Sequence, residues 1–87
     1  MIAGFRQYKR IDYTPTQGIV KLSDTGMHVI IEVTANETAD INFFPNIAEG
    51  WANGGGIPVK AGQTRQIPMT VYNFQADGDC TVVAYGL

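Results

Sequence analysis

Apolar and polar residues alternate along much of this chain, and the alternation is clearest over residues 27–35. One face of this segment carries Met27, Val29, Ile31 and Val33. A period of two over this length indicates an extended strand with one buried face, because helical spacing would scatter these side chains around the axis. The β-branched residues in the segment favour the same interpretation. We therefore predict a half-buried strand over 27–35.

The last third of the chain predicts two strands joined by a turn. Residues 66–74 alternate, residues 76–79 read Ala-Asp-Gly-Asp, and residues 80–87 form an almost unbroken apolar run. Aspartate and glycine are good turn formers, and a terminal run this apolar must be buried. We predict a hairpin of 66–74 with 80–87 as the centre of the domain.

Shorter segments complete the pattern. Strands are expected over 18–23, 39–44 and 57–60, and a single helical turn over 46–49. Six to eight short strands with frequent turn residues and no convincing helix predict an all-β fold. We expect a small antiparallel β-sandwich or barrel, jelly-roll-like, since both architectures share these signals. Residues 13–87 are predicted to form this single β domain, and residues 1–12 an N-terminal arm or edge strand.

Composition narrows the classes of function. With 87 residues and a 45% hydrophobic fraction, the chain is one folded domain with a small core. Such a core leaves modest stability, which docking onto other subunits would supplement. The formal charge of −2 argues against a nucleic-acid partner, and no apolar run reaches the roughly 20 residues of a membrane helix. The first residues lack the apolar core of a secretory signal, so we expect synthesis in the cytoplasm.

The first ten residues combine aromatic and basic side chains. Phe5 and Tyr8 lie among Arg6, Lys9 and Arg10, which are three of the six basic residues. Three interpretations stay open for this segment. It can be a solvated edge strand or extended arm, an arm that binds a neighbouring subunit, or a stacking and phosphate-binding segment for nucleic acid. The overall charge favours the first two.

No catalytic constellation is evident. His28 is the only histidine and Ser23 the only serine, and no nucleophile-elbow pattern surrounds the serine. We expect an exposed or interface histidine. Cys80 is the only cysteine, so an internal disulfide is impossible. Because Asp79 precedes it, the pKa of the thiol should be raised, and we expect a small buried residue.

Metal and cofactor sites are not predicted either. Asp77 and Asp79 bracket a glycine, but the other ligands of a calcium loop are missing. The glycines at 54–56 lack the lysine and serine of a phosphate-binding loop. Trp51 is the one residue that suggests binding. It either caps the core or anchors a partner or a sugar ring.

The second half of the chain also suggests a family. Residues 56–64 (Gly-Ile-Pro-Val-Lys-Ala-Gly-Gln-Thr), then Ile67-Pro68, Val71-Tyr72 and residues 80–87 (Cys-Thr-Val-Val-Ala-Tyr-Gly-Leu), resemble small virion proteins of tailed bacteriophages. In these proteins a strand ends in a valine-x-alanine-glycine turn, and an apolar strand closes the domain. The resemblance covers about residues 56–87.

The resemblance implies a structural role as a capsid decoration or cement protein in the virion, with no enzymatic activity and no cofactor. Its partners would be the major capsid protein or another virion protein, together with further copies of itself, and neither nucleic acid nor membrane. The side chains expected at the interface combine aromatic and basic types: Phe5, Arg6, Tyr8, Arg10, Tyr13 and Trp51. The alternative is a small module that binds a carbohydrate or a receptor through Trp51, with Asn46 and Asn53 nearby.

Overall fold

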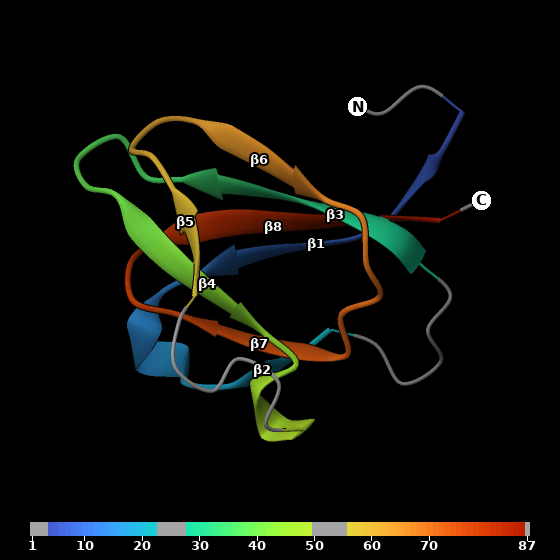
Figure 1. Cartoon of the computed structure of the whole chain (residues 1–87), viewed down its shortest axis with the longest axis horizontal. Helices are drawn as coiled ribbons and strands as arrows, with labels where there is room; N and C mark the ends of the chain where they lie inside the picture. The colour runs from blue at the N-terminus through green and yellow to red at the C-terminus, as the bar shows by residue number, and fades with distance from the viewer. Residues whose placement is uncertain (1–3, 23–27, 50–55, 87) are drawn as a thin grey trace.

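Eight strands form two four-stranded antiparallel sheets in the computed structural model, which describes residues 4–22, 28–49 and 56–86 (Figure 1). The strands are β1 (Arg6–Tyr13), β2 (Val20–Lys21), β3 (His28–Ala35), β4 (Ile41–Pro45), β5 (Ile57–Val59), β6 (Thr64–Ile67), β7 (Asn73–Ala76) and β8 (Cys80–Gly86). Two short 3₁₀ turns, η1 (Pro15–Gln17) and η2 (Ile47–Glu49), interrupt the strand pattern. The all-β prediction is confirmed.

The strand order identifies the architecture. The first sheet runs β1-β8-β3-β6 and the second runs β2-β7-β4-β5. The first strand therefore pairs with the last, the second with the seventh, the third with the sixth and the fourth with the fifth. This is the pairing of one long hairpin rolled into a two-sheet sandwich, the jelly roll. The sequence pattern fitted either a sandwich or a barrel. The eight strands form two separate sheets and no closed barrel, so the structure is a sandwich.

The core lies between the sheets, and the period-two pattern fills it. On β3 the side chains of Ile31 and Val33 are fully buried, and β4 buries Ile41 and Phe43 in the same alternating way. Phe74 on β7 joins the layers. Its ring lies 5.1 Å from that of Tyr13 and 5.2 Å from that of Phe43, measured between ring centroids. The predicted buried face of the strand over 27–35 is confirmed at its described side chains.

The predicted C-terminal hairpin is wrong. Residues 66–74 do not form one strand, because β6 ends at Ile67 in the first sheet and β7 begins at Asn73 in the second. Pro68 follows β6 directly, has no N–H to donate, and ends the ladder there. The chain then crosses between the sheets, with Val71 buried on the way. The turn at 77–79 joins β7 to β8 across the sandwich, and β8 pairs with β1 and β3 instead.

Three turns gather at one end of the sandwich, which we call the turn end (residues 36–40, 60–63 and 77–79). It lies opposite the start of β1 and the end of β8 (Figure 1). Asn36 ties these turns together. Its backbone N–H and its side-chain amide both donate to the carbonyl oxygen of Asp79, at 3.1 and 2.9 Å. Its own carbonyl accepts the N–H of Gly62 at 2.7 Å. The turn end is therefore a single hydrogen-bonded unit built from three distant segments.

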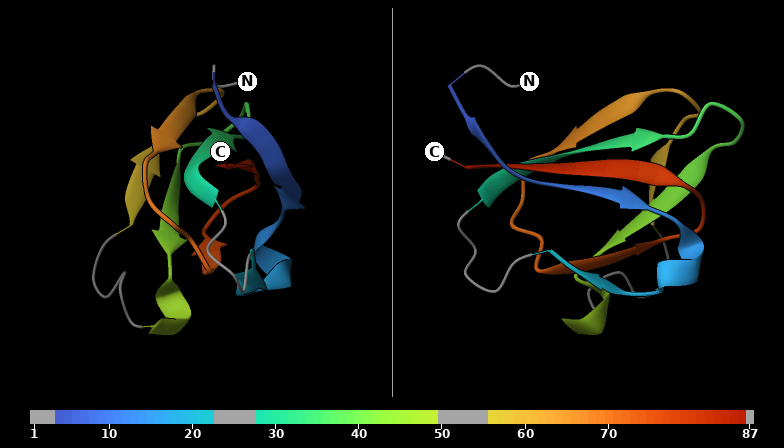
Figure 2. Two further views of the ribbon diagram at one scale, coloured as in Figure 1. Left: turned by 90° about the vertical axis from the view of Figure 1, so that its right-hand side faces the viewer. Right: turned by 180° about the vertical axis from the view of Figure 1, so that it is seen from behind.

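Near the opposite end, two strands bulge at the same level of the sheet. The pairing of β1 with β8 shifts between Gln7 and Lys9, and that of β3 with β8 shifts between His28 and Ile30. Both shifts lie next to Tyr85 on β8. A bulge bends its strand and increases its twist. The first part of β1 accordingly turns away from the body of the sandwich (Figure 2).

Candidate interaction surface

The longest exposed run on a strand of the described chain belongs to β1, an edge strand of the first sheet. Five consecutive side chains, residues 6–10, are exposed, and only Tyr13 at its far end is buried. Phe5 lies just before the strand and is half-buried. Arg6, Lys9 and Arg10 thus place three positive charges along one edge, with Tyr8 among them at 43% exposure.

The other three sheet edges are shorter or interrupted. β2 has two residues, β5 has three with Pro58 at its centre, and β6 has four and stops at Pro68. Short edges and edge prolines discourage the addition of a further strand. The edge strands β5 and β6 are also joined across the sandwich, since Nη1 of Arg65 donates to the carbonyl of Pro58 at 2.9 Å. β1 is therefore the longest sheet edge in the described chain.

The cations of β1 differ in how they are used. Nη2 of Arg10 lies 3.2 Å from Oδ1 of Asp12, and both side chains are more than half exposed. The same carboxylate oxygen accepts a hydrogen bond from the hydroxyl of Thr81 at 3.2 Å. Within the described residues, Arg6 and Lys9 make no ion pair or side-chain hydrogen bond. Their charges are available to a partner.

The residues expected at the interface do not all lie on the surface. Arg6, Tyr8 and Arg10 share the exposed edge and Phe5 is half-buried just before it, but Tyr13 is 2% exposed. Its ring packs on Phe74, and its hydroxyl donates to the carbonyl of Gly18 at 2.6 Å. Tyr13 therefore supports the core and is removed from the candidate surface.

Two further candidates lie outside the described part of the chain, one of them only in its side chain. Trp51, on which the carbohydrate alternative depends, lies outside the described residues. The backbone of His28 belongs to β3, but its side chain also lies outside the description.

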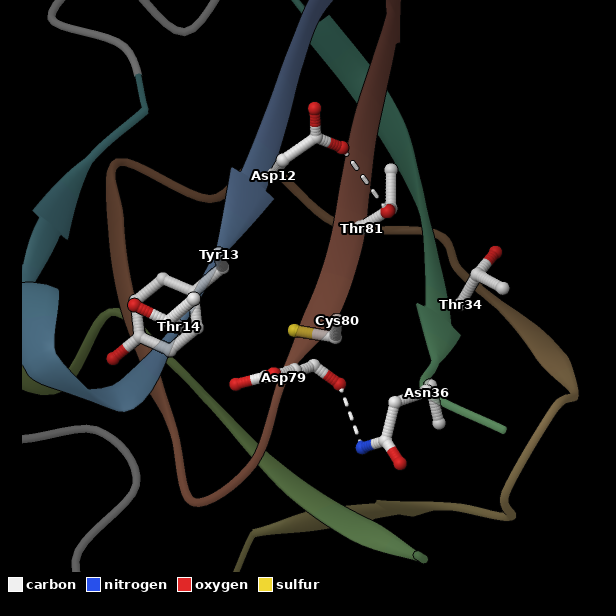
Figure 3. A pocket seen from close by; sticks show the side chains of 9 residues that line it. Asp12, Tyr13, Thr14, Thr34, Asn36, Asp79, Cys80 and Thr81 are labelled. Atoms are coloured by element: carbon white, nitrogen blue, oxygen red, sulfur yellow. Dashed lines mark hydrogen bonds between the residues drawn. The ribbon is translucent and has the colours of Figure 1, made fainter. Parts of the chain in front are cut away.

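A shallow cleft of about 270 Å³ opens beside the turn end, where β1 and β3 finish and β8 begins (Figure 3). Hydroxyl, amide and carboxylate groups surround it. Its lining consists of Asp12, Tyr13, Thr14, Thr34, Ala35, Asn36, Asp79, Cys80 and Thr81. Figure 3 shows Asp12 bonded to Thr81 on one side of the cleft and Asn36 bonded to Asp79 on the other.

The carboxylates around the turn end are also used unequally. Asp77 accepts two hydrogen bonds from Asn42, at 2.7 Å from its backbone N–H and 3.0 Å from its side chain. Asp40 accepts the N–H of Ala61 at 2.9 Å and lies 3.7 Å from Nζ of Lys60.

The carboxylates of Asp79, in the cleft, and of Glu37, beside Asn36, have no such partner among the described residues. A cleft with hydroxyls and an unpaired carboxylate suits a cationic group with hydrogen-bond donors.

Cys80 is the one strongly perturbed titratable group in the cleft. Burial, and then the negative charges of Asp79 and Asp77, raise the pKa of its thiol to about 12. The side chain is 6% exposed. The expectation of a small buried thiol is confirmed, and a thiol with this pKa is a poor nucleophile at neutral pH.

The described residues provide neither a cluster of side chains suited to a metal ion nor a helix suited to a membrane. They contain no cluster of three or more histidine, cysteine, aspartate or glutamate side chains arranged to hold a metal ion. No helix among them has the length and apolar character needed to cross a bilayer.

The cleft had no signal in the sequence. Its lining comes from residues 12–14, 34–36 and 79–81, which lie far apart in the chain and meet only because β1 and β3 both flank β8. The edge strand did have one, since residues 6–10 read Arg-Gln-Tyr-Lys-Arg and contain no aliphatic side chain that would alternate with the polar ones. Comparison with protein-family models, with curated proteins and with solved structures gave no match for this chain.

Proposed function

We propose that the protein is a structural component of a tailed-bacteriophage particle, a decoration or cement protein that binds the major capsid protein and neighbouring copies of itself. The observation that carries this proposal is the edge strand β1. Its exposed run of residues 6–10 contains three cations and an aromatic side chain. The other sheet edges are short, and one contains proline. Such a strand is suited to docking against another protein.

The fold supports this role by analogy. Jelly rolls occur in viral capsid domains, as well as in lectins and cupins. Because one fold hosts many functions, the analogy narrows the classes without choosing among them. The resemblance of residues 56–87 to small phage virion proteins favours the first class.

The mechanism is stabilisation by mass action. A protein that binds only the assembled lattice makes that lattice harder to open, by a free energy that grows with the logarithm of its concentration over Kd. Each contact can be weak, because many copies on one particle act together. Aromatic and arginine side chains such as Tyr8 and Arg6 are typical of the centres of such interfaces.

Particle binding tests the proposal directly. Purified particles of the phage that carries this gene should contain the chain in many copies, and empty shells lacking it should bind the purified protein on co-sedimentation. Deleting residues 1–12, which removes most of β1 and its pairing with β8, should abolish binding. Arg6→Gln with Lys9→Gln leaves the backbone of the strand in place and should weaken binding by about tenfold or more. Ala48→Glu, an exposed position on η2 away from β1, serves as the control and should bind normally.

Absence of the chain from purified particles would contradict the proposed function. So would full binding by both the deletion variant and Trp51→Ala. Genes for a portal, a protease and a capsid protein beside this one would agree with it.

A further inference from the structure

In the described chain, the charged side chains that have neither an ion pair nor a hydrogen bond lie at opposite ends of the molecule according to their sign. The two cations without a partner, Arg6 and Lys9, lie on the first half of β1. The two carboxylates in the same condition, Glu37 and Asp79, lie at the turn end. The other charged side chains of the described chain have an ion-pair or hydrogen-bond partner or another interaction: Arg10, Lys21, Lys60, Arg65, Asp12, Glu32, Asp40 and Asp77.

These opposite charges cannot meet within one molecule. Arg6 is paired in register with Gly86 at the end of β8, and Asp79 immediately precedes the first residue of that strand. A strand of this length spans about 20 Å, and the whole molecule is 31 Å along its longest axis. Over such a distance the attraction is screened at physiological salt. The charges can be brought together only by a second copy.

We infer that copies of this chain associate head to tail, with the arm of one copy (residues 5–9) seated against the cleft beside the turn end of the next. Residues 5–7 of this arm lie beyond the bulge between Gln7 and Lys9, where the first part of β1 turns away from the body of the sandwich, so they can reach a neighbour (Figure 2). Arg6 and Lys9 would face Asp79 in the cleft and Glu37 in the adjoining turn, whose carboxylate lies against Gly62. The threonine hydroxyls of the cleft can accept hydrogen bonds from the guanidinium.

The geometry of such a contact has a consequence for assembly. The two surfaces are different patches at opposite ends of the molecule, so the contact is heterologous, and repeating it produces a ring or an open chain. The contact is small and exposed, so it should be weak in solution and sensitive to salt. On a particle, binding to the lattice would align the copies and strengthen it. The inference thus extends the proposed structural role by naming a second copy as one partner.

A charge-swap experiment tests this contact with the purified chain alone. Sedimentation velocity at about 50 mM salt should show concentration-dependent association that weakens by about tenfold or more in 0.5 M salt. Arg6→Glu with Lys9→Glu should abolish association, as should Glu37→Lys with Asp79→Lys, because each variant carries one sign of charge at both ends. Mixing the two variants should restore association, since each now complements the other.

The control separates the contact from net charge. Arg6→Gln and Ala48→Glu change the formal charge by the same amount, but only the first should weaken association. All these positions lie on exposed turns or edges, and circular dichroism should show unchanged folding. A wild-type chain that stays monomeric at low salt, or swapped variants that fail to associate when mixed, would overturn the inference.

The remaining outcomes concern other occupants of the cleft. If the wild-type chain is monomeric and Glu37→Lys with Asp79→Lys abolishes binding to empty shells, the capsid protein occupies the cleft and the inference is wrong. If soluble glycans quench the fluorescence of Trp51 while salt has no effect on association, the inference is wrong and the carbohydrate alternative is supported instead. The sedimentation and mixing experiments use the purified chain without particles. Failure of the head-to-tail contact is therefore distinguishable from failure of the proposed virion role.

Discussion

The hydroxyl of Tyr85 on β8 donates a hydrogen bond of 2.8 Å to Oε1 of Glu32 on the neighbouring strand β3. The other carboxylate oxygen accepts Nε2 of Gln66 on β6 at 3.3 Å. Three strands of the first sheet are therefore linked by one carboxylate. The hydrogen bond to Glu32, followed by burial and by the charge of Glu32, raises the pKa of Tyr85 above its usual value of 10.0.

This link predicts a loss of stability at alkaline pH. Because the pKa of Tyr85 is higher in the folded than in the unfolded chain, its contribution is complete below pH 10 and is lost as pH rises above that value. Tyr85→Phe should cost about 1 kcal/mol at pH 7 and should flatten the fall in stability between pH 9 and 11. Urea unfolding at several pH values measures both effects. Tyr72→Phe, at a 42% exposed position, is the control, and an unchanged pH profile for Tyr85→Phe would contradict the prediction.

The thiol of Cys80 should be unreactive until the protein unfolds. With a pKa of about 12 against 9.0 in the unfolded chain, its thiolate fraction at pH 8 falls by about a thousandfold. We expect the native protein to react with a thiol reagent at least about a hundredfold more slowly than the chain in urea. The same raised pKa means that the folded state loses stability as pH rises from 9 towards 12. Equal rates for the folded and unfolded chain would show that Cys80 is accessible and ionised.

Replacing Asn46 with another residue should lower the stability of the fold. It has a left-handed backbone with φ of 54°. Its side chain accepts the N–H of Tyr72 at 2.7 Å and donates to the carbonyl of Thr70 at 3.1 Å, which holds the crossover segment against β4. Asn46→Ala should cost about 2–3 kcal/mol, from two lost hydrogen bonds and backbone strain.

Two variants of Asn46 separate these causes. Asn46→Gly relieves the strain and should recover about 1 kcal/mol. Asn46→Asp keeps the acceptor for Tyr72 but loses the donor for Thr70, so its stability should lie between those of the wild type and the alanine variant. Thermal unfolding would measure the order, and equal stability for all three variants would contradict it.

Gly78 should not tolerate a side chain, because of Ile41. A Cβ atom at Gly78 would lie 2.6 Å from Cγ2 of Ile41, a core residue that is 1% exposed. Gly78→Ala should therefore destabilise the fold by about 1–3 kcal/mol. In the double variant with Ile41→Ala the clash disappears, so the combined loss should be smaller than the sum of the single losses. Strict additivity in denaturant unfolding would show that the two sites do not interact.

The sequence patterns predicted buried side chains best where burial depends only on alternation within one strand. The buried positions Ile41 and Phe43 follow from alternation alone, and so does the burial of Cys80 in an apolar run. The failure at 66–74 has a physical cause, since alternation across Pro68 does not reveal that the chain changes sheet there. The prediction that Tyr13 lies at the interface was wrong for a related reason. An aromatic residue in a basic segment looks exposed until the strand that carries it is known to end over Phe74.

The amino-acid sequence by itself determined that this protein is built of short strands with one apolar face, because period two and turn residues act within a few positions of each other. Only the tertiary structure decided that β8 lies between β1 and β3, that Asn36 joins its own turn to two others, and that unpaired cations and carboxylates occupy opposite ends. Those relationships join residues dozens of positions apart. They depend on which strands pair, and strand pairing is set by the packing of the whole core.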